Sequence, residues 1–324
     1  MGIKTLSIII PAYNVEKYIS HCLKNLTTVI DDLDIIVVND GSTDNTLKPV
    51  KDFQKKHKES VQIIDKQNGG HGSTINAAIK LAQGKYLRVL DSDDWLNEET
   101  IEKYLEELKS SNDDLILTNY SYNYVSENRK ELVDVYNKIG KIKKLAEISK
   151  LDVSGHEFIS LLAIHSCTIK TEKLKKIWGD GLLEKTFYED QEFIAKVILA
   201  ADSVKCLDMD VYQYMIGRDE QSVSSEKLFK KRKDHERVLS ELVDIYGDCK
   251  DDDKKEILGR RIEEMFKTHY WIYFYHSGIK HSEKKEFKKI KKVLKAKMPN
   301  IDRNIAKSFK LRLMIGRLKN TMLK

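Results

Sequence analysis

The chain has 324 residues, 41% of them hydrophobic, and a net charge of +6. This length predicts two domains, with an ample core for the first. No apolar run approaches the length of a transmembrane helix, no N-terminal signal sequence is recognisable, and the 4 cysteines lack paired metal spacing, so we expect reduced thiols in a cytoplasmic protein.

Short apolar runs separated by helical segments predict the strands of the N-terminal half. The first run, Leu6 to Ile10, should end at Pro11, which cannot donate to a neighbouring strand. Asn14 should then cap a helix with one apolar face. That face carries Val15, Ile19, Leu23 and Leu26. Further strands are expected at Ile35 to Val38, Val61 to Ile64, Tyr86 to Leu90 and Leu115 to Thr118.

A polar turn follows each of the first strands. These turns are Pro11–Asn14, Asn39–Asp44, Asn68–Gly72 and Asp91–Asp94. Strands alternating with helices predict an α/β fold with a mostly parallel sheet and helices on both faces. Ligands of such sheets bind at the carboxyl ends of the strands, so these turns should form one site.

The turn Asp91-Ser92-Asp93-Asp94 carries the strongest chemical signal. Carboxylates this close together repel one another unless a cation lies among them. Oxygen ligands beside an open face suit Mg²⁺ or Mn²⁺, which also take phosphate oxygens. An Asp-x-Asp pattern alone is equally consistent with a plain polar turn, and the other turns favour a metal that holds a phosphate.

The segments SIIIPAYNVEKYISHCLKNL, IIVVNDGSTDNT and GKYLRVLDSDDWL resemble the motifs of the inverting family 2 glycosyltransferases. The resemblance covers roughly residues 5–100 and continues more weakly to about residue 225. It implies a GT-A (Rossmann-like) catalytic domain over residues 1–224. The implied reaction transfers a sugar from a nucleotide-sugar, most simply UDP-linked, to a glycan hydroxyl with inversion and with Mn²⁺ or Mg²⁺.

The resemblance also implies roles for residues near the nucleotide. Pro11, Ala12 and Tyr13 should lie at the base, with the Tyr13 ring available for stacking, although a core tyrosine is the alternative. Asp40 should bond to the base or ribose, while Asp44 caps the next helix.

Similar roles follow for the acidic turn. Asp91 is expected near the ribose, Ser92 at the donor, and Asp93 in direct contact with the metal. Asp94 is either a second ligand or a cap before Trp95.

The glycine-rich turn Asn68–Gly72 lets the backbone approach a ligand, and the following helix start attracts phosphate. Many relatives carry an arginine on this helix, which this chain lacks. Either His71 or Lys66 supplies the contact instead, or His71 is a plain loop histidine.

The catalytic base is expected in TFYEDQEF, where Glu189 and Asp190 begin an apolar helix. Acids at a helix start also serve as simple caps. The resemblance favours Asp190 as the base for the acceptor hydroxyl, with Glu189 beside it. Arg218 either pairs with the diphosphate or is a surface arginine.

Helical periodicity dominates residues 225–324, which we expect to form an all-α domain. The aromatic cluster from His269 to His276 should lie in a core or in a subunit contact of a homo-oligomer. From His281 to Lys324 there are 15 Lys and Arg but only 3 Asp and Glu, a local charge of +12. This region binds the inner membrane surface, an acceptor or another subunit, or it is a solvated face, and no nucleic-acid motif accompanies it.

Two other functions use the same kind of fold. A sugar nucleotidyltransferase would need a glycine-rich basic loop after the first strand, which PAYNVEKY lacks. A non-catalytic binding module would have no need of both Asp93 and Asp190. We therefore expect a transferase that acts on a glycan carried by lipid or protein.

Overall fold

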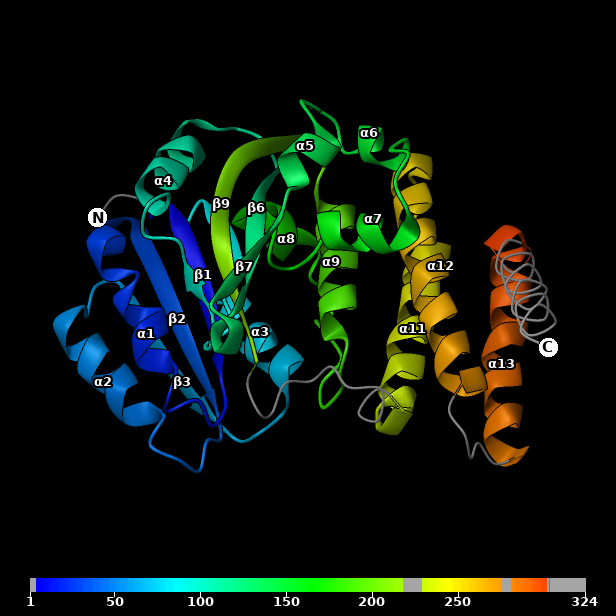
Figure 1. Ribbon diagram of the computed structural model, residues 1–324, viewed down its shortest axis with the longest axis horizontal. Helices are drawn as coiled ribbons and strands as arrows, with labels where there is room; N and C mark the ends of the chain where they lie inside the picture. Colours follow the sequence, from blue (N-terminus) through cyan, green and yellow to red (C-terminus); the bar gives the residue numbers. More distant parts are fainter. Residues whose placement is uncertain (1–3, 218–228, 276–280, 302, 304–324) are drawn as a thin grey trace. The chain divides into compact units, whose positions relative to one another are not determined.

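The structure, a computed structural model, describes residues 4–217, 229–275, 281–301 and 303 (Figure 1). The chain forms two compact units, Met1–Ser222 and Val223–Lys324, and each is described by itself. Every strand of the described residues lies in the first unit, and the regular elements described in the second are helices.

A 9-stranded mixed sheet forms the centre of the first unit, in the order β3-β2-β1-β4-β8-β6-β9-β5 with β7 paired to β6. The strands are β1 (Leu6–Ala12), β2 (Leu33–Asp40), β3 (Val61–Lys66), β4 (Tyr86–Val89), β5 (Trp95–Leu96), β6 (Leu115–Tyr124), β7 (Arg129–Val133), β8 (Cys167–Lys170) and β9 (Val204–Ile216). Strands β1 to β4 are parallel, β8 is antiparallel to β4 and β6, and β9 is parallel to β6. The mostly parallel α/β sheet expected from the sequence is confirmed.

Helices pack around this sheet (Figure 1). They are α1 (Ile19–Lys24), α2 (Leu47–Lys56), α3 (His71–Ile79), α4 (Ile101–Ser110), α5 (Val135–Ile139), α6 (Ala146–Ser149), α7 (Gly155–Leu161), α8 (Thr171–Ile177) and α9 (Glu189–Ala200). Every residue of β1, β2 and β4 is buried, as expected for parallel strands covered on both faces.

The prediction that Pro11 ends the first strand is wrong. Strand β1 runs through Pro11, which pairs with Val38 of β2. The carbonyl of Ile9 accepts from the Leu90 amide at 2.9 Å, so the backbone at Ile9 faces the β4 side. Pro11, two residues on, faces the same side beyond the last paired residue of β4, and its missing amide hydrogen costs no ladder bond.

Asn14 does not cap a helix, because α1 begins only at Ile19. Its φ is 53°, and its side-chain oxygen accepts from the Thr43 amide at 2.8 Å. Asn14 therefore joins the turn after β1 to the turn after β2. The predicted apolar helical face is confirmed, since Ile19 and Leu23 are buried.

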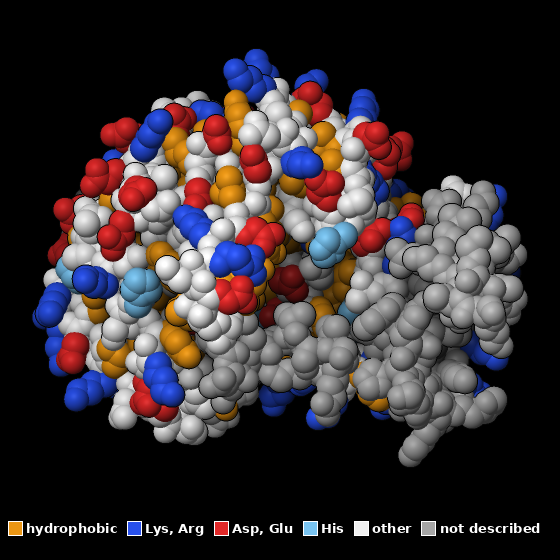
Figure 2. All heavy atoms as spheres, in the orientation of Figure 1, with side chains coloured by type: hydrophobic (Ala, Val, Ile, Leu, Met, Phe, Trp, Pro, Cys, Tyr) orange, Lys and Arg blue, Asp and Glu red, His pale blue; other side chains and the backbone are white. Residues whose placement is uncertain are grey.

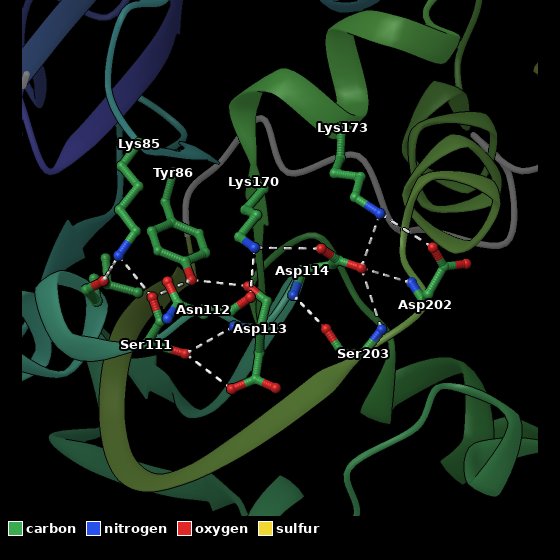
Figure 3. Close-up of polar contacts among 11 residues, drawn as sticks. Lys85, Tyr86, Ser111, Asn112, Asp113, Asp114, Lys170, Lys173, Asp202 and Ser203 are labelled. Atoms are coloured by element: carbon green, nitrogen blue, oxygen red, sulfur yellow. Dashed lines mark hydrogen bonds and ion pairs between the residues drawn. The ribbon is translucent and has the colours of Figure 1, made fainter.

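A polar network holds together the end of the sheet where β4, β6 and β9 begin (Figure 3). The buried Asp114 accepts from the amides of Asp202 and Ser203 at 3.0 and 3.3 Å, and Lys173 Nζ lies 3.3 Å from its carboxylate. Burial alone would raise the pKa of Asp114, but these amides and Lys173 outweigh it and lower the pKa. The network ties the strand starts together with a charged carboxylate.

In the second unit, α11 (Arg232–Asp248) contacts both α12 (Asp252–Tyr275) and α13 (His281–Lys297). The predicted apolar face of α12 is buried at Leu258, Ile262 and Phe266, whereas the side chains of residues 270–276 lie outside the described residues. All 4 cysteines are free thiols, as expected. None of the helices that the structure describes combines the length and the apolar character needed to span a bilayer.

Candidate functional site

The turns after β1 to β4 meet at the carboxyl edge of the sheet and bond to one another, as their order in the sequence predicts. Asp40, the last residue of β2, is 2% exposed. Its Oδ1 accepts from Lys66 Nζ at 2.7 Å and from the Gly69 amide at 2.9 Å, and its Oδ2 accepts from the Gly70 amide at 2.8 Å. Gly70 has a φ of 84°, a conformation that favours glycine. Asp40 therefore holds the glycine-rich turn in place.

His71 is the first residue of α3 and lies between two carboxylates. Its Nε2 is 3.0 Å from Asp91 Oδ1, and its Nδ1 is 2.8 Å from Glu189 Oε1 without the angle of a hydrogen bond. Burial would lower the pKa of His71, but Asp91 and Glu189 outweigh it and raise the pKa well above its ordinary value. His71 is therefore an imidazolium that links the start of α3, the turn after β4 and the start of α9.

Glu189 and Asp190 do begin a helix, since α9 starts at Glu189. Tyr188 before it has a φ of 74°, which a side chain disfavours and which is common near functional sites. Glu189 is buried against His71, whereas the half-buried Asp190 accepts from Gln191 Nε2 at 2.8 Å. The two acids thus have different environments at one helix start.

Asp94 is not a cap before Trp95, because no helix begins there and Trp95 pairs with Gln213 of β9. The fully buried Asp94 instead accepts from Tyr212 Oη at 2.6 Å and from the Met215 amide at 2.8 Å. Burial, and then the charges of the neighbouring aspartates, raise the pKa of Asp94 well above its ordinary value. Asp94 anchors the acidic turn to β9.

The rest of the acidic turn is more accessible. Asp91 contacts His71 and is 29% exposed at its side chain, Ser92 is buried, and Asp93 is half-buried. Tyr13 is 50% exposed, while Pro11 and Ala12 before it are buried. The Tyr13 ring is therefore open for stacking. On the face drawn in Figure 2, hydrophobic side chains lie scattered among charged ones.

His165, which sequence reasoning missed, lies against the acidic turn. It precedes β8, and its ring centroid is 4.8 Å from that of Tyr212 and 4.7 Å from that of Tyr214. Burial, helped by the charge of Arg88, lowers the pKa of His165 to about 4, so the ring is neutral near pH 7. No motif marks this histidine, because it comes near Asp91 only through the placement of β8 beside β4.

Arg88 was also missed, although a charged residue inside an apolar strand is a visible signal. It is fully buried in β4 and donates to Thr168 Oγ1 at 3.1 Å and to the carbonyl oxygen of His165. Among the described residues, no carboxylate lies within ion-pair distance of Arg88. It therefore places a positive charge beneath the acidic turn and holds the His165 backbone.

These residues fit a divalent cation. One ligand atom from each of Asp91, Asp94 and His165 lies within 4.8 Å of the others. Carboxylate oxygens and a neutral imidazole nitrogen suit Mn²⁺, and the oxygens alone suit Mg²⁺. Arg218 lies outside the described residues. The structure thus brings together Asp40, His71, Asp91, Glu189 and Asp190 at one edge.

Residues 7–164 match the model of Glycosyl transferase family 2. The chain carries a domain of this glycosyltransferase family. The match includes the turns after β1 to β4 and ends just before His165, so β8, α9 and β9 lie outside it.

Relatives of the family 2 domain include enzymes that build bacterial glycans. Chondroitin synthase of Escherichia coli is 41% identical over 105 residues, which are 32% of this chain and 15% of that protein. The poly(ribitol-phosphate) beta-glucosyltransferase of Bacillus spizizenii is 29% identical over 237 residues, 68% of this chain and 33% of that protein. The chain thus spans a third or less of either relative.

A solved structure extends the likeness beyond the family 2 domain. Residues 1–349 of S. aureus TarS, crystallised in complex with UDP-GlcNAc, superpose with a TM-score of 0.66 at 22% identity. The superposition covers 92% of this chain and 83% of that one. This likeness shows the GT-A fold.

Proposed function

We propose that the chain is an inverting glycosyltransferase that moves a sugar from a nucleotide donor to a hydroxyl of a glycan acceptor. The observation that carries this is the contact of His71 with both Asp91 and Glu189 inside a family 2 domain. It places the Asp-x-Asp turn and the acidic start of α9 on either side of one side chain. A donor diphosphate at this turn would then have Asp190 within the same site.

The donor half of the site is proposed from exposure and bonding. Tyr13, exposed at the end of β1, would stack on the base. Asp40 would contact the base or ribose and, through Gly69 and Gly70, shape the turn beside the phosphates. Asp91 and Ser92 would lie next to the ribose. A UDP-linked sugar is supported by the UDP-GlcNAc complex of TarS, whose fold this chain shares.

A divalent ion fits the acidic turn. Asp93 is our first candidate for direct contact. The ligand atoms of Asp91, Asp94 and His165, which lie within 4.8 Å of one another, support an ion at the same turn. Bound there, Mn²⁺ or Mg²⁺ would act as a Lewis acid that neutralises the charge of the leaving nucleotide diphosphate. His71, as an imidazolium, adds a second positive charge near Asp91.

Asp190 is proposed as the base. Its carboxylate would remove the proton of the acceptor hydroxyl as that oxygen attacks the anomeric carbon. Glu189 would position His71 rather than take part in proton transfer, since it is buried against the imidazole. The acceptor would be a glycan on lipid or protein, and self-association stays a prediction.

The test is turnover of a panel of UDP-, GDP- and dTDP-linked sugars with Mn²⁺, read as nucleotide diphosphate release. Asp190→Asn should lower turnover about 10²–10⁴-fold, the usual contribution of a general base, and leave UDP affinity unchanged. Glu184→Gln, in the exposed loop before α9, is the matched control and should change neither.

Two results would contradict the proposal separately. Near-normal turnover by Asp190→Asn would remove the base assignment. Failure of every nucleotide-sugar in the panel to bind or turn over would remove the transferase itself.

A further inference from the structure

Helix α13 of the second unit carries a face made of lysines. The side chains at these positions are exposed, and they recur at the three- and four-residue spacing of one helical face. The lysine face consists of Lys285, Lys288, Lys289, Lys292 and Lys295. It extends for about 15 Å at the rise of an α-helix. The opposite side of α13 is buried at Leu294 and Met298.

The ion pairs that the structure describes on α13 do not involve the lysine face. Among the described side chains, no carboxylate lies within ion-pair distance of any of its lysines, whereas Lys297 at the end of α13 pairs with Asp244 of α11. Like charges three and four residues apart destabilise a helix. The lysines of this face therefore repel one another, and an external anion that binds them would relieve this repulsion.

We propose that the lysine face of α13 binds the surface of a bilayer that contains anionic lipid. Its charges lie along one helix of the described chain, so they can approach a plane of phosphate groups together. Val293, 42% exposed, borders this face and adds an apolar side chain of the kind that enters the headgroup region. Each lysine near such a surface adds attraction that falls off within a Debye length.

This inference does not depend on the proposed sugar transfer. It accounts for the basic composition of the region from His281 onward by a feature of the described helix, its one-sided array of exposed lysines. A catalytic unit with no affinity for lipid would still be held at a membrane that carries its acceptor.

The test is flotation of the full chain with vesicles of phosphatidylcholine alone or mixed with phosphatidylglycerol. The unchanged protein should float with the anionic vesicles at about 50 mM salt and be released at about 0.5 M salt. A variant combining Lys288→Glu, Lys289→Glu, Lys292→Glu and Lys295→Glu should bind the anionic vesicles with an affinity at least about 100-fold lower. A second variant with the same lysines changed to glutamine should also lose binding while keeping its helix content.

A matched control changes the net charge equally on the first unit. It combines Lys48→Glu, Lys51→Glu, Lys56→Glu and Lys58→Glu, all at exposed positions, and should retain vesicle binding within about threefold. Equal loss in this control would overturn the proposal, as would absence of binding by the unchanged protein at low salt. Binding of soluble polyphosphate without binding of anionic vesicles would also overturn it, in favour of a polymer partner. Nucleotide-sugar turnover by the same variants reports separately on the proposed reaction.

Discussion

Replacing Asp40 by asparagine should destabilise the first unit and weaken nucleotide binding together. Asp40→Asn keeps the side-chain shape but has one acceptor oxygen where the carboxylate has two. The carboxylate accepts from Lys66, Gly69 and Gly70, so the new amide group must face at least one of these donors. A charge-assisted hydrogen bond contributes about 1.5–3 kcal/mol.

The free energy of unfolding should fall by about 2–4 kcal/mol, because one such bond is broken and the buried turn loses its charge. Lys66 is partly exposed, so it recovers some hydration and limits the effect. Urea unfolding followed by hydrogen exchange of β1 and β2 peptides would measure the free energy of unfolding of the first unit by itself. Calorimetric titration with UDP and Mn²⁺ would show weaker binding, because the glycine turn that carries His71 is no longer held.

The control for Asp40→Asn is Asp52→Asn, which removes an exposed carboxylate paired with Lys55 on α2. It should leave stability and UDP affinity unchanged. If Asp40→Asn stays within about 1 kcal/mol of the unchanged protein and binds UDP equally well, the assignment of Asp40 as the residue that holds this turn is refuted.

Two further predictions concern other positions. Gly72→Ala would place a methyl group 2.5 Å from the Leu183 carbonyl oxygen, so α3 must shift. The free energy of unfolding should fall by about 1–3 kcal/mol, and UDP affinity should fall with it. The control Gly247→Ala, at a position with open space around it, should change neither stability nor UDP affinity. A normal UDP affinity for Gly72→Ala would count against the role of this close approach. Burial, and then the charge of His269, lower the pKa of His235 to about 3, so His235 is neutral in the folded second unit. Because this pKa lies below the unfolded value of about 6.5, the unfolded chain takes up a proton at His235 before the folded unit does as the pH falls. The contribution of His235 to the free energy of unfolding is therefore complete above about pH 6.5 and is lost below it, by about 2 kcal/mol between pH 7.5 and 5. His235→Gln should flatten this dependence, measured by hydrogen exchange of α11 amides, and an unchanged slope would contradict it.

Several elements of the site follow from local chemistry and were predictable. Apolar runs that end in Asn39-Asp40-Gly41 or Asp91-Ser92-Asp93 mark strands and turns wherever they occur, because strand and turn preferences act over a few residues. Parallel strands then place these turns at one edge. The start of α9 at Glu189 was predictable for the same local reason, two acids before an apolar helical run.

The strand end at Pro11 and the cap role offered for Asp94 were mispredicted because the deciding partner is distant in the sequence. A proline is excluded from a strand only where a neighbour needs its amide, and β4 has ended at that level. Asp94 resembles a helix cap until Tyr212 and Met215 of β9 are placed beside it. Contacts between residues far apart in the chain override local propensity here, and Asp94 and Tyr212 are separated by 118 residues.

The sequence by itself determined the strands β1 to β4 and β6, the family likeness and the acidic turn, because these depend on residue types at short spacing. Only the tertiary structure decided that His165 and Arg88 lie beside that turn and that His71 joins Asp91 to Glu189. The reason is that burial and the electric field of distant charges set the protonation of these groups, and both depend on which segments the fold brings into contact.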